Sequence, residues 1–387
     1  QGDPYYGTEK VVIEDGVTGL CDYAFSKLSN LSSVSIPASV TKIGINAFNE
    51  CRNLTSVYIT DLVAWCNIDF ANDKSNPLFC AEALYLNGDL LQGEVVIPSG
   101  VSVIPMYALG CHNITSVIIP YGVTEISDFA FRYCKNLTSV TIPDSVVTIG
   151  VSAFASCYNL TEVIIPDSVT TIGKKAFYNC SSLKDITLSE SLTAIAEETF
   201  SSCESLETIT IPGSVKNIGI LAFDYCTGLA DINFCEGVES IDYCAFYNCT
   251  SLTSLDLSNF TFESNPNIES MFYSTGSNAT NKPIPIYVTP NTKSYIEWID
   301  SDEKDDDNSN IDNNNATLVV IDEDESIEYT LLPTGPEFNT IVDEYISKTS
   351  GITKIKFIAI YCSFNFWSNY NKHTNKHRIH SKNFNYI

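Results

Sequence analysis

Positive charge is scarce in this sequence. The 387 residues include 21 lysines and arginines against 47 aspartates and glutamates, which gives a formal net charge of −26. A field of that sign repels phosphate backbones, so the composition argues against DNA and RNA as partners. It also disfavours binding to bare anionic membrane surfaces.

Long apolar runs are missing as well. No stretch of about 18 or more apolar residues occurs, so the sequence predicts no membrane-spanning helix. The apolar fraction is nevertheless 44%, which is ample for a packed core and excludes a wholly disordered chain. Residue 1 is Gln rather than Met, so we expect a processed product or a fragment.

Residues that support catalysis are few. Of the four histidines, only His112 precedes the last 36 residues. A nucleophile needs a base beside it, yet no G-x-S-x-G motif occurs, and the S-x-x-K match at Ser181–Lys184 lies inside a regular repeat. We therefore predict no enzyme, no catalytic residue, no metal and no cofactor.

Three columns of residues recur every 23 positions. The cysteines of the series are Cys111, Cys134, Cys157, Cys180, Cys203, Cys226 and Cys249. The aliphatic residues are Ile114, Leu137, Leu160, Leu183, Leu206, Leu229 and Leu252. The phenylalanines are Phe131, Phe154, Phe177, Phe200, Phe223 and Phe246. Three columns with one period indicate an array of stacked repeats.

One clean repeat runs from 137 to 159. Val140 and Ile142 alternate with polar residues, which predicts a short strand with one buried face. Pro143 ends this strand because it has no N–H to donate. Val146 and Ile149 then point inward, Gly150 turns the chain, and Ala153-Phe154 begins a tight helical or 3₁₀ turn.

No single repeat can bury both its leucine and its phenylalanine, so neighbouring repeats must stack. We predict a right-handed α/β repeat solenoid with a short-stranded parallel sheet on one face and turns on the other. The expected core includes Leu137, Phe154, Cys157, Leu160, Phe177, Cys180, Leu183, Phe200 and Cys203.

The spacing of the repeats divides the chain. Residues 1–61 form N-terminal repeats, 62–94 an irregular insertion and 95–275 the main array. Within the insertion, Asn87-Gly88 between apolar runs predicts a two-residue hairpin.

The end of the chain departs from the repeat. Residues 276–330 are expected to form a cap, with a strand and a short helix within 283–298 and a further strand at 316–321. An acidic low-complexity loop interrupts this cap, since 13 acidic residues and one basic residue occur from Glu297 to Glu328. Residues 331–387 are expected to be a poorly ordered tail, and from 352 onward it carries six lysines or arginines and no acidic residue.

The regular cysteine column has three interpretations. Successive rungs of a parallel stack lie about 4.8 Å apart, a spacing at which a disulfide is feasible. Metal ligation is the second interpretation, but the repeats contain no C-x-x-C pair. Leu28 replaces the cysteine in the first repeat, which favours the third interpretation of buried free thiols packed as small apolar groups.

The outward positions of the predicted strands are mostly polar. Glu162, Asp185 and Asp231 share one outward row, Asn233 and Asp256 share the next, and Tyr58 is an aromatic exception. These six residues are the candidate binding residues. The two rows without Tyr58 suit a cation or a basic partner, with an ordinary solvated face as the alternative. A long, rigid, polar surface suits an extended protein or glycan.

The repeat pattern L-x-x-V-x-I-P-x-x-V-x-x-I-G-x-x-A-F-x-x-C-x-N resembles the leucine-rich repeats of BspA-like surface antigens and Treponema-type proteins. The likeness covers roughly residues 10 to 275. It implies a secreted or surface-displayed adhesion or recognition protein of a bacterium or protist, binding a protein or glycan on host or neighbouring cells. An intracellular protein-interaction scaffold is the alternative.

Overall fold

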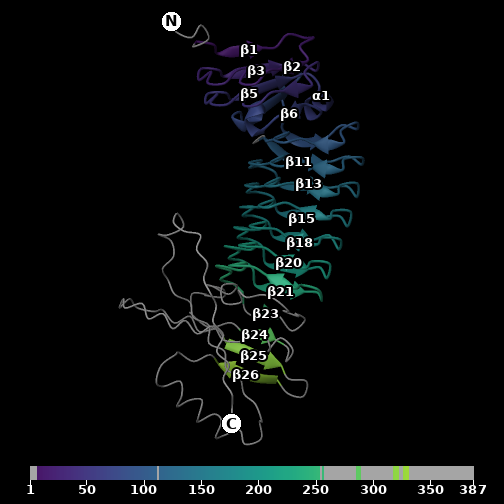
Figure 1. Ribbon diagram of the computed structural model, residues 1–387, viewed down its shortest axis with the longest axis vertical. Coiled ribbons are helices and arrows are strands. Elements are labelled where there is room, and N and C mark those ends of the chain that lie inside the picture. Colours follow the sequence, from purple (N-terminus) through teal and green to yellow (C-terminus); the bar gives the residue numbers. More distant parts are fainter. Residues whose placement is uncertain are drawn as a thin grey trace, which may run out of the picture.

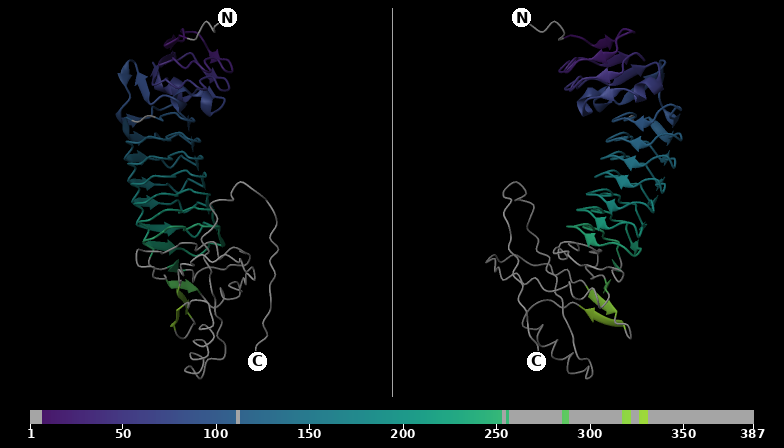
Figure 2. Two further views of the ribbon diagram at one scale, coloured as in Figure 1. Left: turned by 90° about the vertical axis from the view of Figure 1, so that its left-hand side faces the viewer. Right: turned by 45° about the vertical axis from the view of Figure 1, so that its right-hand side comes forward.

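The computed structural model describes residues 7–110 and 113–252, and the backbone of four later strands, β23 to β26. The predictions for Cys111 and His112, for the helix within 283–298, for the acidic loop and for the tail lie outside these residues. The described chain is an elongated stack of coils (Figures 1 and 2).

One strand from each coil contributes to the first column of parallel strands. From β1 to β7 these pair as β1-β3-β5-β7, from β9 to β17 they pair in sequence order, and β19 pairs with β21. Partners lie one repeat apart, as in Val117 opposite Val140. The column consists of β1 (Lys10–Val12), β3 (Ser33–Ile36), β5 (Ser56–Ile59), β7 (Ala83–Leu86), β9 (Gly93–Val96), β11 (Ile114–Ile118), β13 (Ser139–Thr141), β15 (Glu162–Ile164), β17 (Asp185–Thr187), β19 (Thr208–Ile211), β21 (Asp231–Phe234) and β23 (Leu255–Asp256). The predicted solenoid of 23-residue coils with a parallel sheet is confirmed.

Each coil also carries a second, two-residue strand that the sequence did not predict. The parallel partners again lie one repeat apart, as in Ile126 opposite Ile149. These strands are β2 (Gly19–Leu20), β4 (Lys42–Ile43), β6 (Asp69–Phe70), β10 (Val103–Ile104), β12 (Glu125–Ile126), β14 (Thr148–Ile149), β16 (Thr171–Ile172), β18 (Ala194–Ile195), β20 (Asn217–Ile218) and β22 (Ser240–Ile241). Opposite the first column there is therefore a second ladder as well as turns.

The core is a set of columns that run along the stack. The Phe154, Phe177 and Phe200 rings are fully buried. Their centroids lie 5.3 and 5.7 Å apart, with interplanar angles of 5° and 12°. Offset stacking at this separation is favourable beyond the burial of apolar area. Each coil thus completes its interior with its neighbours.

The helical or 3₁₀ turn expected at Ala153-Phe154 is wrong. Ser152 and Ser156 adopt left-handed backbone conformations, with φ of 52° and 61°, and a helix cannot pass through such residues. The amides of Ser152, Phe154 and Ser156 instead donate to carbonyl oxygens of the next coil, at 2.9, 2.8 and 2.7 Å. These bonds between coils alternate with bonds within the turn, in which the amides of Ala155 and Cys157 donate to the carbonyls three residues earlier, at 3.1 and 3.2 Å.

Gly150 is needed for close packing of coils rather than for a turn. Its φ is not positive, but a Cβ atom placed there would lie 2.5 Å from the backbone N of Asp128 in the preceding coil. Gly44, Gly173 and Gly219 are similarly crowded by backbone atoms. The expected turning role of Gly150 is therefore corrected to a steric one.

Residues 62–90 form an irregular coil. Asp61 caps α1 (Leu62–Cys66) by accepting a hydrogen bond from the amide of Ala64 at 3.0 Å. The short 3₁₀ helices η1 (Asp73–Ser75) and η2 (Pro77–Phe79) follow. The indole N–H of buried Trp65 donates to the carbonyl of Ala108 at 2.8 Å. This contact ties the irregular coil to the main array.

The irregular coil keeps both strand ladders. Its strands β6 and β7 pair in parallel with β4 and β5. The hairpin prediction is confirmed, because β7 pairs antiparallel with β8 (Asp89–Leu90) through left-handed Asn87 and Gly88. Residues 62–90 are therefore built into the stack.

In the part of the chain that the structure describes, three strands follow the array. The predicted strands are confirmed as β24 (Pro285–Val288) and β25 (Thr317–Ile321), which pair in parallel. An antiparallel strand that the sequence did not predict, β26 (Ser326–Thr330), pairs with β25. On the other side, β24 pairs in parallel with β23, so the ladder continues past the last regular coil.

Candidate functional site

The candidate surface is the outer face of the first strand column, on the side away from the core. Alternation along each strand places every second residue on this face. The first outward row of the main array is Glu94, Ser116, Ser139, Glu162, Asp185, Thr208 and Asp231. The second row is Val96, Ile118, Thr141, Ile164, Thr187, Thr210 and Asn233.

The structure brings Glu162 and Asp185 together. They face each other on adjacent parallel strands, and both are exposed. Neither belongs to an ion pair with a described residue. Like charges on directly opposed strand residues destabilise a sheet slightly, and a basic group of a partner would relieve that repulsion.

The other acidic candidates lie farther along the same face. Thr208 separates Asp231 from Asp185, and Asn233 is the next outward residue after Asp231 on β21. Asp256 is exposed on β23, one repeat beyond Asn233. These residues extend the polar face without forming a compact cluster.

Tyr58 lies on a different sheet from the acidic candidates. Its ring stacks on Tyr85 with centroids 4.6 Å apart and an interplanar angle of 18°. The two tyrosines are opposite each other on β5 and β7. Tyr85 was missed because the step from β5 to β7 is longer than one repeat, although its alternation within Ala83–Leu86 was a usable signal.

Apolar side chains interrupt the second outward row. Ile164 is 60% exposed and Val96 is 57% exposed. Ile164 and Val96 are β-branched, and β-branched residues favour the strand conformation. Strand propensity alone does not explain why they are apolar, because the polar β-branched residues Thr141 and Thr187 occupy other positions of the same row. The exposed aliphatic groups therefore add apolar contact area beside the acidic row.

The cysteine column has its own hydrogen-bonding role. All nine residues named as the expected core are buried. The Sγ atoms of Cys157, Cys180 and Cys203 each donate to the carbonyl of a phenylalanine in the preceding coil, at 3.2, 3.2 and 3.3 Å. Desolvation raises the pKa of Cys180 to about 12. Since the thiolate is the reactive and metal-binding form, these thiols are suited to packing.

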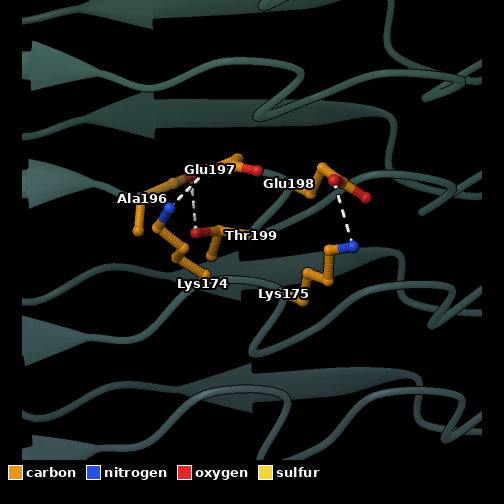
Figure 3. A network of polar contacts seen from close by, with 6 residues as sticks. All are labelled: Lys174, Lys175, Ala196, Glu197, Glu198 and Thr199. Atoms are coloured by element: carbon orange, nitrogen blue, oxygen red, sulfur yellow. Dashed lines mark hydrogen bonds and ion pairs between the residues drawn. The ribbon is translucent and has the colours of Figure 1, made fainter. Parts of the chain in front are cut away.

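Charged side chains link coils on the turn side. Lys174 pairs with Glu197, and Lys175 with Glu198 at 3.1 Å, each across one repeat (Figure 3). Thr199 donates to the carbonyl of Ala196 at 2.8 Å within the same turn. Exposed pairs of this kind each contribute little to the free energy of unfolding.

Asp224 is the one strongly perturbed carboxyl among the described residues. Burial, and to a smaller extent the negative charge of nearby Glu198, raise its pKa to about 6. Its Oδ1 atom is buried without a partner, while Ser201 donates to Oδ2 at 3.4 Å. The folded state therefore favours the protonated form of Asp224.

Replacing Asp224 with asparagine should stabilise the protein at pH 7.5. The folded state binds the proton of Asp224 more tightly than the unfolded state does. The resulting stabilisation is fully present below about pH 4 and is lost as the pH rises through the folded pKa of about 6. We expect a gain of about 1–2 kcal/mol, less than the roughly 3 kcal/mol of a two-unit shift, because solvent screens a partly buried group. Urea unfolding at pH 7.5 and pH 4 measures the gain, which should vanish at the lower pH.

The control for Asp224 is Asp144→Asn, because Asp144 is exposed. Its effect on stability should be small and independent of pH. If Asp224→Asn changed the stability equally at both pH values, the cost of burying Asp224 would not come from its negative charge.

Within the described residues, no three His, Cys, Asp or Glu side chains gather as they would around a metal ion. In the same part of the chain, no helix has both the length and the apolar character needed to cross a membrane.

The family model for the BspA type leucine rich repeat region matches six copies over residues 5–74, 91–161 and 147–278. Among solved structures, the chain is similar to a leucine rich cell surface protein of Faecalibacterium prausnitzii A2-165, at 26% identity over 67% of this chain and 89% of the other, with a TM-score of 0.33. It is similar to a leucine-rich repeat protein from Bacteroides ovatus at 22% identity, over 82% of this chain and 85% of the other, with a TM-score of 0.38. It is similar to the pneumococcal vaccine antigen PcpA at 14% identity, over 76% of this chain and 87% of the other, with a TM-score of 0.44. No curated protein matches the chain.

Proposed function

Because this chain belongs to the BspA-type leucine-rich-repeat family, we propose that it is an extracellular or cell-surface recognition protein that binds a protein or glycan on the outer face of its first strand column. Leucine-rich repeats of this kind are typically non-enzymatic and bind proteins. We therefore propose binding rather than catalysis as the function.

One observation carries the proposal. The outer face presents two rows in register over β11 to β17, one bearing Glu162 and Asp185 and the other bearing exposed Ile164. A protein interface commonly combines apolar contacts with a polar rim. A rigid face of this kind binds an extended partner without having to reorganise.

Surface labelling of intact cells with a membrane-impermeant biotin reagent tests the location. The protein should be labelled on intact cells to the same extent as after lysis. Labelling only after lysis would contradict the extracellular location.

The second candidate function is an intracellular scaffold. It is favoured by the thiols of the cysteine column, because Cys157, Cys180 and Cys203 form no disulfide, and cysteines that remain reduced are typical of the cytosol. The labelling experiment separates the two functions, since the scaffold would be protected until the cells are lysed.

Photo-cross-linking tests the binding face itself. A benzoylphenylalanine at position 164 should form an adduct with the native partner on cells, because Ile164 projects from the outer face. The same group in place of Tyr225, which is 47% exposed in a turn, is the matched control and should form none. Equal adducts at both positions, or an adduct only at position 225, would contradict binding on the outer face.

A further inference from the structure

An arginine lies between two aromatic rings at a turn away from the outer face. Arg132 follows β12, and its Cζ atom is 5.3 Å from the ring centroid of Phe129 and 4.8 Å from that of Tyr133. Its Nη2 donates to the hydroxyl of Tyr133 at 3.3 Å. These contacts hold the guanidinium in one place and orientation.

The aromatic surface continues into the two preceding coils. Phe129 stacks on Tyr107 with centroids 5.4 Å apart and an interplanar angle of 8°. Tyr107 meets Phe79 edge to face at 5.7 Å. Phe79 and Tyr133 are each 41% exposed. We call Phe79, Tyr107, Phe129, Arg132 and Tyr133 the Arg132 cluster.

Three aromatic residues of the cluster lie at backbone conformations that disfavour bulky side chains. Tyr107, Phe129 and Tyr133 all have left-handed conformations, with φ of 56°, 58° and 63°. Bulky side chains are unfavourable there, and small or amide side chains are tolerated better. The next coil places Ser152 and Ser156 at the positions of Phe129 and Tyr133, so the fold itself does not require aromatic rings.

The charge of Arg132 is not balanced by a neighbouring carboxylate. No carboxylate of the described residues lies within ion-pair distance of it, whereas Arg52 lies 3.9 Å from Glu50. Its Nε atom is buried and has no hydrogen-bond partner among the described groups. Because Nε is buried and one Nη2 hydrogen is bonded to Tyr133, the N–H groups that remain for a carboxylate are those of the two terminal nitrogens, which bind it in a planar, bidentate geometry.

We propose that the Arg132 cluster binds a glycan that ends in a carboxylated sugar. The sugar carboxylate pairs with the guanidinium of Arg132, and the apolar face of the sugar ring packs on the exposed ring of Tyr133. Phe79 extends the aromatic surface.

The overall charge narrows the ligand. A net charge of −26 repels polyanions at long range, which disfavours sulfated polymers and nucleic acids. A largely neutral glycan with a single terminal carboxylate meets little of this repulsion. The site is separate from the outer face, so this proposal does not depend on the proposed function.

Binding of 3′-sialyllactose and lactose to the purified full chain tests the proposal, measured by titration in ligand-detected NMR. The two sugars share the lactose unit and differ in the carboxylated residue. We expect binding of 3′-sialyllactose and none of lactose. Arg132→Gln should weaken binding by about tenfold or more, because it removes the charge and the bidentate geometry. Arg52→Gln is the matched control and should bind as the wild type does.

Three results would overturn the proposal. They are no binding of 3′-sialyllactose, equal binding of lactose, and an affinity of Arg132→Gln that stays within about twofold of the wild type. If Arg132→Gln fails to fold, as judged by circular dichroism, Tyr133→Ser replaces it. That variant copies Ser156 of the next coil, should fold, and should lose most of the binding.

Discussion

Truncating Phe177 to alanine should lower the free energy of unfolding by about 3–5 kcal/mol. Its ring is fully buried and stacks between Phe154 and Phe200, at 5.3 and 5.7 Å. Both neighbouring coils would then face a cavity that a rigid stack cannot close. Urea unfolding followed by circular dichroism measures the loss as a lower midpoint.

A leucine at position 177 is the matched control. Leu109 already occupies the phenylalanine position in its own coil and is fully buried there, so the fold accepts leucine at this point of the stack. Phe177→Leu should cost about 1–2 kcal/mol. A loss below about 1 kcal/mol for Phe177→Ala would mean that the phenylalanine column does not hold the coils together.

Replacing Gly150 with alanine should cost about 2–3 kcal/mol, although it adds only one methyl group. The new Cβ would lie 2.5 Å from the backbone N of Asp128 and 2.6 Å from the carbonyl carbon of Ser127. Because these are backbone atoms in the preceding coil, the only relief is to move the coils apart. Thermal unfolding should show a clear fall in Tm.

Gly19→Ala is the control for this steric argument. Gly19 lies in a short strand of the second column, whereas Gly150 directly follows one, and a Cβ at Gly19 meets Lys42 only at 3.5 Å, an ordinary contact distance. We expect a change of about 0.5 kcal/mol or less. Equal losses for the two variants would point to a general cost of removing glycine rather than to the close approach of coils.

The stack was predictable because the residues that form it repeat with one period. Phe154, Phe177 and Phe200 recur every 23 residues, and packing keeps them in register. The second strand column escaped prediction because each strand has two residues, of which at most one, such as Ile149, is buried. Two residues are too few to show an alternation.

The turn was predicted wrongly for a physical reason. Left-handed conformations can usually be predicted from a glycine or asparagine in the sequence, but here they also occur at Ser152, Ser156 and Phe129. Hydrogen bonds to the next coil stabilise these conformations. Such bonds depend on stacking, which a reading of one repeat cannot show.

The candidate surface was predictable only in part. The register that places Glu162 beside Asp185 follows from the period. The stacking of Tyr58 on Tyr85 and the position of Arg132 depend on irregular coils and on turn positions whose residue types do not repeat. The binding role of the outer face remains a prediction.

A crystal structure tests most directly whether coils 23 residues apart build a shared interior. The expected electron density places the Phe154, Phe177 and Phe200 rings nearly parallel in one buried column, with centroids 5.3 and 5.7 Å apart. Rings that point into solvent, or that pack only within their own coil, would contradict the stack and remove the continuous face on which binding is proposed.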